Sequence, residues 1–413
     1  MKTRVVVTGM GAVTPLGNST QAMWEALLAG RSGVGPLVGY DLSEFDTQFG
    51  AQVKNFDPLS VIDRKEARRT DTFVLYALGA AREALAQANL SIDEQNRDCV
   101  GVVIGTGLGG FRTVLDSNAV WKEKGARRIS PFSLPAFLPD TAAGMIAIEL
   151  GARGPNMAIT SACATGTDAI GQAVEMIRRG QATTVIAGGT EASCHPFAFA
   201  MFNNMKVLST RNDAPEQASR PFDAERDGFV LGEGAGVLVL ERLEDAERRG
   251  VPILGEIIGY GSAVDAYHMA IPPDDANGII RAMVAAMRDS GLAADDVDYV
   301  NAHGTGTTVN DKVETYAIKK VLGDHAYRMA VSSTKSMMGH LMGAAGAVEA
   351  VISLKALHEG IIPPTINYDN PDPAIALDVV PNVKREAEVR TVLSNSFGFG
   401  GQNTCLVMAR EAG

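Results

Sequence analysis

Short apolar runs rich in β-branched residues alternate along the chain with alanine-rich stretches whose apolar positions recur every three or four residues. Four such runs predict buried strands, at residues 4–9, 99–107, 156–161 and 183–189. Two alanine-rich stretches predict helices, at residues 71–90, ending before Asn89, and at 166–180. Residues 236–250 predict a strand that continues into a charged helix. This alternation is typical of an α/β fold.

The pattern starts again after Gly250, and the second part resembles the first. VGVVIGTGLGG (100–110) and VDYVNAHGTGT (297–307) are both apolar runs that end in Gly-Thr-Gly. Residues 158–174 and 330–351 both predict a strand, a turn of small residues and a helix rich in alanine and glycine. We therefore predict a duplication, with two similar halves at residues 1–250 and 251–413 packed into one body. Equivalent loops of the two halves would then converge on one site.

Charge and cysteine usage narrow the classes of partner and compartment. The formal net charge of −11 argues against nucleic acid as the main partner. The four cysteines lie far apart without a CxxC pair, which predicts neither a zinc site nor a disulfide framework and favours a reducing compartment. Thr8 and Gly9 interrupt the N-terminal apolar run too early for a signal peptide, and no apolar stretch reaches the ~18 residues of a membrane helix. We expect a cytoplasmic protein that does not bind a membrane.

Residues 159–171, ITSACATGTDAIG, place Cys163 among small residues where a predicted strand gives way to a predicted helix. An isolated cysteine in such a place is more often a small packed residue. The start of a helix, however, lowers the pKa of a thiol and favours thiolate. Ala162 and Ala164 leave room for a substrate, and the N–H of the cysteine is available to an oxyanion. The turn by itself makes Cys163 a candidate nucleophile.

Two of the six histidines lie in equivalent loops of the predicted halves. His303 ends a strand before a glycine turn, and His340 follows Lys335 by five residues. A lone histidine is more often a core residue than a catalyst. Two in matched loops, with a cysteine in a third, favour a catalytic set. The other four are expected to be structural or on the surface: His195, His268, His325 and His358.

Two glycine-rich runs need separate interpretations. SNSFGFGGQN (394–403) alternates Phe and Gly, which is poor for a strand interior and indicates either a bulged turn or a loop that approaches a ligand closely. The other candidate loops favour the second interpretation. GTGLGG (105–110) matches the GxGxxG fingerprint, but no second strand follows at the required distance, so we do not predict a dinucleotide site.

Taken together, ACATGTDAIG, NAHGTGT, STKSMMGHLMGAAGAVE and SNSFGFGG resemble motifs of the elongating β-ketoacyl-[acyl carrier protein] synthases of type II fatty-acid synthesis. The resemblance runs from RVVVTGMGAVTPLG almost to the C-terminus, in the order of that family. It implies an α/β fold of the thiolase type, five-layered (αβαβα) and built from two similar halves, and usually a homodimer. The family commonly has Thr where this chain has Gln402.

The resemblance also implies roles for individual residues. Cys163 is similar to the acyl-accepting nucleophile, and His303 and His340 to the pair that binds the extender carbonyl. Lys335 and Glu349 resemble the residues that organise these histidines, and Phe399 resembles a gatekeeper whose N–H completes an oxyanion hole. Positions that contact the phosphopantetheine arm or the acyl chain are matched by Thr305, Thr307, Leu108 and Phe202.

The implied reaction is a decarboxylative Claisen condensation that extends a fatty acyl chain by two carbons, with no metal or cofactor. The substrates would arrive on acyl carrier protein. On a chain this acidic, DRKEARR (63–69) stands out as a basic cluster, although a charge run is usually a solvated helix face. The family docks its carrier near here, so we expect docking at Arg64, Lys65, Arg68, Arg69 and Lys206.

Three other functions share parts of this pattern. A degradative thiolase needs a second cysteine near the C-terminus, but GGQNTC around Cys405 does not resemble its CxG turn. A non-catalytic chain-length factor generally lacks the nucleophile, which is present here as Cys163. A catalytic ketosynthase of a type II polyketide or polyene pathway remains the main alternative.

Overall fold

The computed structural model describes residues 2–410. Within this range ten strands form one sheet, in the order β3-β2-β4-β5-β1-β6-β12-β11-β7-β8. Their bounds are β1 (Val5–Val13), β2 (Val100–Gly105), β3 (Asn156–Met157), β4 (Thr184–Glu191), β5 (Gly234–Arg242), β6 (Gly255–Val264), β7 (Tyr299–Asn301), β8 (Ala330–Ser332), β11 (Thr391–Gly398) and β12 (Gln402–Ala409). A separate small sheet pairs β9 (Ile361–Ile362) with β10 (Arg385–Glu386).

The sheet has the same sequence of antiparallel and parallel strand pairs on each side of its centre. β1 and β6 pair at the middle, where Val6 faces Glu256. From there each side adds two antiparallel and then two parallel neighbours, β5-β4-β2-β3 on one side and β12-β11-β7-β8 on the other. The two sides are therefore architectural repeats. The division of the chain at residue 250 stays a prediction.

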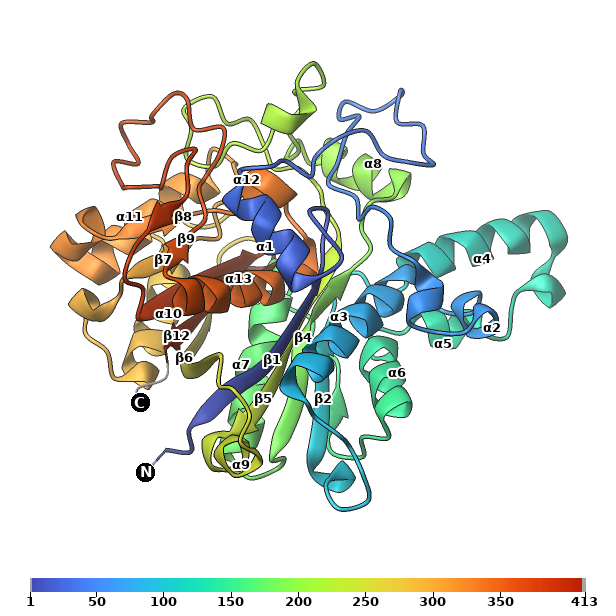
Figure 1. Cartoon of the computed structure of the whole chain (residues 1–413). Coiled ribbons are helices and arrows are strands. Elements are labelled where there is room, and N and C mark those ends of the chain that lie inside the picture. Colours follow the sequence, from blue (N-terminus) through green and yellow to red (C-terminus); the bar gives the residue numbers. More distant parts are fainter. Residues whose placement is uncertain (1, 411–413) are drawn as a thin grey trace.

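Helices cover both outer faces of this assembly and fill its centre (Figure 1). α3 (Thr72–Ala88) packs on β1 and β5, and α10 (Asn277–Ser290) packs on β6 and β12. α7 (Thr165–Arg178) and α13 (Ala345–Glu359) contact each other and strands of both sides. The two sides of the one sheet, with α7 and α13 between them and helices on their outer faces, give the predicted five layers. The remaining α-helices are α1 (Thr20–Leu28), α2 (Arg64–Ala67), α4 (Phe111–Lys124), α5 (Ser133–Phe137), α6 (Thr141–Leu150), α8 (Pro196–Asn204), α9 (Leu243–Arg249), α11 (Asn310–Leu322) and α12 (Lys335–Met338).

Most predicted elements are confirmed, and one is wrong in length and burial. α3 ends at Asn89, which adopts a left-handed conformation (φ 46°) and accordingly stops the helix. The strand predicted at 156–161 is limited to Asn156 and Met157, both exposed. It is the edge strand of the sheet and pairs only with β2 among the described strands, so its outer backbone groups have no strand partner. In the described part of the chain, no helix is long and apolar enough to cross a membrane.

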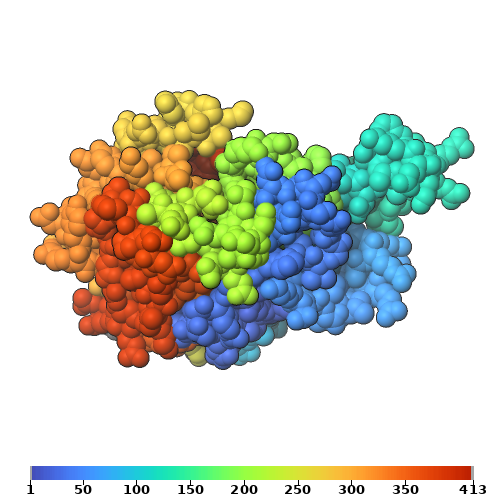
Figure 2. All heavy atoms as spheres, turned by 90° about the horizontal axis from the view of Figure 1, so that it is seen from above, coloured from blue at the N-terminus to red at the C-terminus, as the bar shows by residue number. Residues whose placement is uncertain are grey.

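α4, α5 and the turn between them project from the body (Figure 2). This projection carries large apolar side chains with wide exposure, among them Trp121 at 55% and Leu134 at 66%. Ile148 on the adjoining α6 is 76% exposed. Soluble monomers rarely present so many large apolar groups on one contiguous segment, so the projection is a candidate interface.

Candidate active site

A strained turn carries Cys163 into the centre of the molecule. Residues Ala162–Ala164 form a single 3-10 turn that leads directly into α7. Ala162 is left-handed (φ 51°), which is unfavourable for a residue with a Cβ. Across the turn lies Gly398, where a Cβ would stand 2.8 Å from the Ser161 carbonyl oxygen and 2.9 Å from the Cys163 nitrogen. The backbone of the Phe-Gly run therefore lies against the turn that carries Cys163. The expectation that this run is a loop is wrong for most of its length, because residues up to Gly398 belong to β11, Gln402 begins β12, and the two strands pair.

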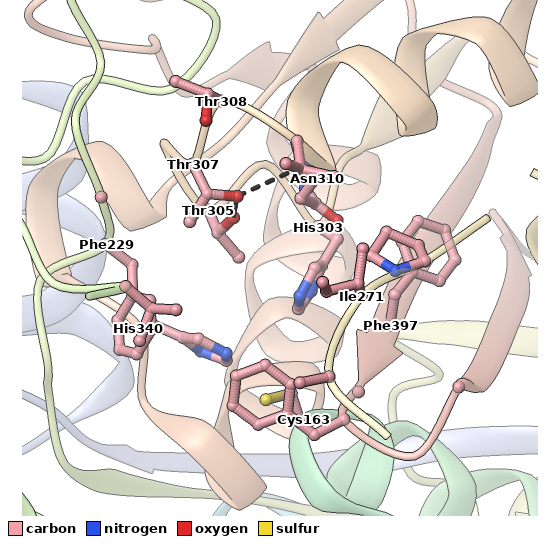
Figure 3. Close-up of a pocket in the computed structure, with 18 of the residues that line it drawn as sticks. Cys163, Phe229, Ile271, His303, Thr305, Thr307, Thr308, Asn310, His340 and Phe397 are labelled. Carbon is pink, nitrogen blue, oxygen red and sulfur yellow. Dashed lines mark hydrogen bonds between the residues drawn. The ribbon is translucent and has the colours of Figure 1, made fainter. Parts of the chain in front are cut away.

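A cavity of about 230 Å³ opens over this turn and is lined from both sides of the molecule. Cys163, His303 and His340 line it, and so do Thr305 and Thr307 (Figure 3). Phe399 belongs to the same lining. The rings of His303 and His340 meet edge to face with centroids 5.3 Å apart. The structure thus brings these six of the residues that the resemblance selects to one cavity, from distant parts of the sequence.

Burial has the largest effect on the pKa of the Cys163 thiol. It raises the pKa of this thiol to about 12, while the positive charge of Lys335 and the backbone N–H groups of Phe399 and Cys163 itself act in the opposite direction. The carboxylate of Glu191 raises it further. The expectation that the helix start would lower this pKa is wrong, because desolvation of the charged form outweighs the helix dipole. The same two N–H groups that face the sulfur form a ready pair of donors.

Both cavity histidines are neutral. Burial holds the pKa of His303 well below its usual range, and the positive charge of Lys335 lowers it further. Burial and Lys335 have the same effect on the pKa of His340. Nδ1 of His340 accepts the Met342 N–H at 3.3 Å, so the proton of the neutral ring is on Nε2. That nitrogen is available as a hydrogen-bond donor.

Lys335 and Glu349 form a buried pair behind the histidines. Lys335 begins α12 and is 1% exposed, and its ammonium hydrogen-bonds to the carboxylate of Glu349 on α13. Burial raises the pKa of Glu349 to about 7, against the opposing effect of Lys335. An ammonium removed from water is costly unless it is paired, and Glu349 provides the pairing. Lys335 in turn places a positive charge close enough to lower the pKa of all three cavity groups.

Two acidic residues of α11 hold the His303 loop, and the sequence analysis did not select them. Glu314 accepts the N–H groups of His303 and Gly304, each at 2.8 Å. Asp311 accepts the Gly306 N–H at 3.2 Å. Both are 0% exposed. The sequence shows that both residues follow a glycine loop closely. It does not show that their carboxylates accept hydrogen bonds from the backbone N–H groups of that loop.

The residues that the resemblance assigns to the substrate arms lie in different surroundings. The hydroxyls of Thr305 and Thr307 are 3.0 Å apart at the cavity wall. Phe202 on α8 belongs to the same buried apolar cluster as Cys163 and Met342. Leu108 follows β2 in a loop whose N–H groups bind Glu191. Neither Leu108 nor Gln402 is among the residues that line the cavity described above.

A further loop reaches the cavity and was missed. Asp265, His268, Ala270 and Ile271 line it beside the Phe-Gly run, where the Met269 carbonyl accepts the Gly400 N–H at 2.7 Å. The ring of His268 accepts the N–H groups of Ala270 and Ile271 through Nδ1, so it stiffens the loop. His268 was expected to be structural or on the surface, and no local pattern distinguishes it from such a residue.

The basic cluster is shorter than a two-turn helix. α2 ends at Ala67, and Arg68 caps it. Arg69 folds back, pairing with Glu66 at 3.4 Å and stacking on Phe132 at 4.0 Å. Arg64, Lys65 and Arg68 remain exposed. Lys206 lies elsewhere, in the lining of the active-site cavity, and pairs with Asp46 at 2.7 Å.

Among the described residues, no group of three or more His, Cys, Asp or Glu side chains is arranged to hold a metal ion. The cysteines are free, with Cys99 exposed and Cys163, Cys194 and Cys405 buried.

Comparison with known proteins gives matches along most of the chain. Residues 2–246 match the family model of the beta-ketoacyl synthase N-terminal domain, and residues 254–369 match that of its C-terminal domain. The 3-oxoacyl-[acyl-carrier-protein] synthase 2 of Synechocystis sp. is 50% identical over 409 residues, which are 99% of this chain and 98% of that protein.

Two solved structures share the whole fold. The crystal structure of a beta-ketoacyl synthase from Burkholderia phymatum STM815 superposes with a TM-score of 0.93 at 38% identity and covers 100% of both chains. A type II polyketide-synthase acyl carrier protein in complex with its ketosynthase, bound to the hexaketide, gives a TM-score of 0.92 at 34% identity, also with 100% of both chains covered.

Proposed function

This chain belongs to the beta-ketoacyl synthase family, and from that premise we propose that it condenses an acyl-enzyme thioester with malonyl-[acyl carrier protein] to extend a fatty acyl chain by two carbons. The observation that carries this proposal is the meeting of Cys163, the Phe399 N–H and two neutral histidines in one buried cavity. The 50% identity to a 3-oxoacyl-[acyl-carrier-protein] synthase 2 favours a fatty acyl over a polyketide substrate, since the polyketide ketosynthase is 34% identical.

Acylation of Cys163 is the first step. The sulfur attacks the carbonyl carbon of the acyl-carrier thioester, a C–S bond forms, and the bond to the pantetheine sulfur breaks. The proton of the Cys163 thiol ends on the departing pantetheine thiolate. The N–H groups of Cys163 and Phe399 point at the sulfur region and would receive the oxygen that becomes negative. Lys335 stabilises negative charge on the sulfur during attack.

Decarboxylation supplies the carbon nucleophile. The neutral rings of His303 and His340 donate hydrogen bonds to the thioester carbonyl of the malonyl group while its C–C bond to the carboxylate breaks and carbon dioxide leaves. The electron pair of that bond forms the enolate, whose carbon then attacks the acyl carbonyl and expels the Cys163 thiolate. The thiolate takes up one proton from solvent, which restores the thiol for the next acylation. Since the electrons come from the malonyl group itself, the steps balance without a metal or an organic cofactor.

Acyl carrier protein is the proposed partner. The exposed Arg64, Lys65 and Arg68 present positive charge on a chain of net charge −11 and suit an acidic partner. Thr305 and Thr307 would bind the phosphopantetheine arm inside the cavity, whose lining also includes the cation Lys206. Charge reversal at Lys65 and Arg68 is expected to raise the KM for the carrier, while Lys384→Glu, an exposed lysine elsewhere, controls for net charge. An unchanged KM would contradict this docking site.

A homodimer is proposed through the projection formed by α4 and α5 together with the edge strand β3. The exposed Trp121 and Leu134 supply apolar area, and β3 has an unpaired outer edge in the described chain. We expect light scattering to give twice the chain mass, and Trp121→Asp with Leu134→Asp to give the single mass. The cytoplasmic location stays a prediction.

Intact-protein mass spectrometry with a series of acyl-carrier thioesters tests the proposal. Wild-type protein should gain the mass of the acyl group, and Cys163→Ala should not. Cys99→Ala, which removes the exposed cysteine, is the matched control and should label like the wild type. Equal labelling of the Cys163→Ala variant would refute the assignment of the nucleophile.

A further inference from the structure

Glu191 ends β4 and is 0% exposed, yet the proposed reaction does not use it. Its carboxylate accepts four hydrogen bonds. Oε2 accepts the N–H of Gly107 at 2.8 Å and that of Gly343 at 3.0 Å. Oε1 accepts the N–H of Leu108 at 3.1 Å and the hydroxyl of Thr106 at 3.0 Å. One carboxylate therefore joins the loop after β2 to the turn before α13.

That turn is the counterpart of the Cys163 turn in the repeated architecture. Met342 is left-handed (φ 49°) as Ala162 is (φ 51°), and each begins a 3-10 turn that leads directly into a central helix. Gly343 therefore occupies the position of Cys163. In the first turn the backbone N–H faces the reactive sulfur. In the second turn the equivalent N–H is that of Gly343, and it donates to the carboxylate of Glu191. A side chain of the protein itself therefore occupies the place that the sulfur of Cys163 occupies in the first turn.

Of the two segments joined by Glu191, one contains Leu108, which resembles a position that contacts the substrate, and the other packs beside Cys163. Met342 is in the apolar cluster that contains Cys163 and Phe202. The loop after β2 contains Leu108, and the Thr106 hydroxyl that donates to Glu191 also accepts the Gly109 N–H at 3.1 Å. The backbone position of this loop thus depends on the carboxylate.

We propose that Glu191 is a positioning residue that sets acyl-chain selectivity by holding the loop Thr106–Gly109 and the turn Met342–Gly343 in fixed relation to Cys163. This inference deepens the proposed condensation and rests on it. A carboxylate is required because all four partners donate: an amide would direct its NH₂ group at backbone N–H donors on one side.

Two substitutions disturb the hydrogen bonds of the Glu191 carboxylate in different ways. Glu191→Gln keeps the shape of the side chain but loses acceptors on one side. Gly107→Ala keeps Glu191 but adds a Cβ that would lie 2.8 Å from Oε2, its only contact closer than 3.7 Å. Glu83→Gln is the matched control, because Glu83 also clamps backbone N–H groups, those of Ala12 and Thr20, away from the cavity.

Two activities are measured on each variant of the full chain. Decarboxylation of malonyl-[acyl carrier protein] reports on the histidines and needs no acyl chain. The kcat/KM values for condensation over a series of acyl-carrier thioesters report on the acyl side. We expect Glu191→Gln and Gly107→Ala to retain decarboxylation and to change the ratio of kcat/KM between the longest and shortest acyl chains by about fivefold or more, the equivalent of one lost hydrogen bond. Glu83→Gln should leave this ratio unchanged.

A ratio unchanged in both Glu191→Gln and Gly107→Ala would overturn the inference, and so would a parallel fall of decarboxylation and condensation, which indicates a structural role alone. If Glu191→Gln does not fold, Gly107→Ala decides. Failure of the proposed function is distinguishable, since it would appear as wild-type protein that neither decarboxylates malonyl-[acyl carrier protein] nor condenses any acyl chain.

Discussion

Cys163 is 4% exposed and lies beside one ammonium and one carboxylate, so opposing influences meet at its sulfur. Desolvation is the largest of them and keeps the thiol protonated at neutral pH. Lys335 and the two N–H groups favour the thiolate but do not overcome burial. Before the thioester binds, Cys163 is therefore a thiol and not a thiolate. We expect it to lose its proton during attack on the thioester.

Alkylation of Cys163 by iodoacetamide should reveal this state. Because the pKa of the thiol lies near 12, the rate should rise about tenfold per pH unit from about pH 7 to about pH 10 without a plateau. The rate is measured on the Cys163 peptide by mass spectrometry in a Cys99→Ser background, which removes the exposed cysteine. A plateau near neutral pH would show a stable thiolate and contradict the dominance of burial.

The neutral histidines lead to a second prediction at this scale. His303→Ala and His340→Ala each remove one donor to the malonyl carbonyl, so decarboxylation should fall by about 10²- to 10³-fold. Acylation of Cys163 should persist, because its proposed oxyanion donors are backbone groups. The rates of carbon dioxide release and of acyl-enzyme formation separate the two steps. Loss of acylation with retained decarboxylation would reverse the assignment.

At the scale of elements, α7 depends on how closely it packs on β6. Asp168, in the first turn of α7, accepts the hydroxyl of Ser161 at 2.5 Å and that of Tyr260 on β6 at 2.6 Å. One helical turn further along, Gly171 lies against the Tyr260 ring. The tyrosine is thus anchored at its hydroxyl and confined at its ring, and it ties the helix that follows the nucleophile to the second side of the sheet.

Gly171→Ala tests this packing. A Cβ there would lie 2.3 Å from two Tyr260 ring atoms, and the anchored ring cannot move aside. We expect a loss of about 1–3 kcal/mol in the free energy of unfolding, measured by chemical denaturation. Gly144→Ala in α6 is the matched control: a Cβ there meets nothing within 4 Å, so the helix should gain about 0.5–1 kcal/mol. Equal effects of the two substitutions would contradict the packing argument.

At the scale of the whole molecule, both sides of the sheet pack against the central helices α7 and α13. Either side alone would leave one face of these helices exposed to water. All residues from Ala345 to Leu357 of α13 are buried, so the helix has no face suited to water. It contacts α7 and strands of both sides. β1 and β6 also pair across the middle. The domain-sized repeats are therefore parts of one cooperative unit.

Separate expression tests this cooperativity. We expect residues 1–250 alone and 251–413 alone to show no cooperative unfolding, because each would expose a face of α7 or α13. The full chain should unfold in one transition, with coincident near- and far-ultraviolet circular dichroism. Co-expression of the two fragments controls for cutting the chain after Gly250 and should restore a folded complex. Independent cooperative transitions of the fragments would contradict a shared core.

Much of this architecture was predictable because its signals are local. Alternating strand and helix patterns, the two Gly-Thr-Gly runs and the paired strand-turn-helix segments indicated an α/β duplication, and the motifs around Cys163, His303 and His340 indicated the family. Such patterns depend on neighbouring residues alone. Glu191, Glu314 and His268 carried no such signal, because their partners are backbone N–H groups, which every sequence contains.

The sequence by itself determined which chemical groups are present, the α/β elements that carry them and the family to which the chain belongs. Only the tertiary structure decided the state of those groups. A helix start predicts a lowered pKa for Cys163, whereas burial among residues from both sides raises it. Likewise, Glu191 joins two distant segments only because folding brings the N–H groups of Gly107 and Gly343 to its carboxylate. Desolvation and hydrogen-bond geometry depend on what surrounds a group in space, and residues distant in sequence supply those surroundings.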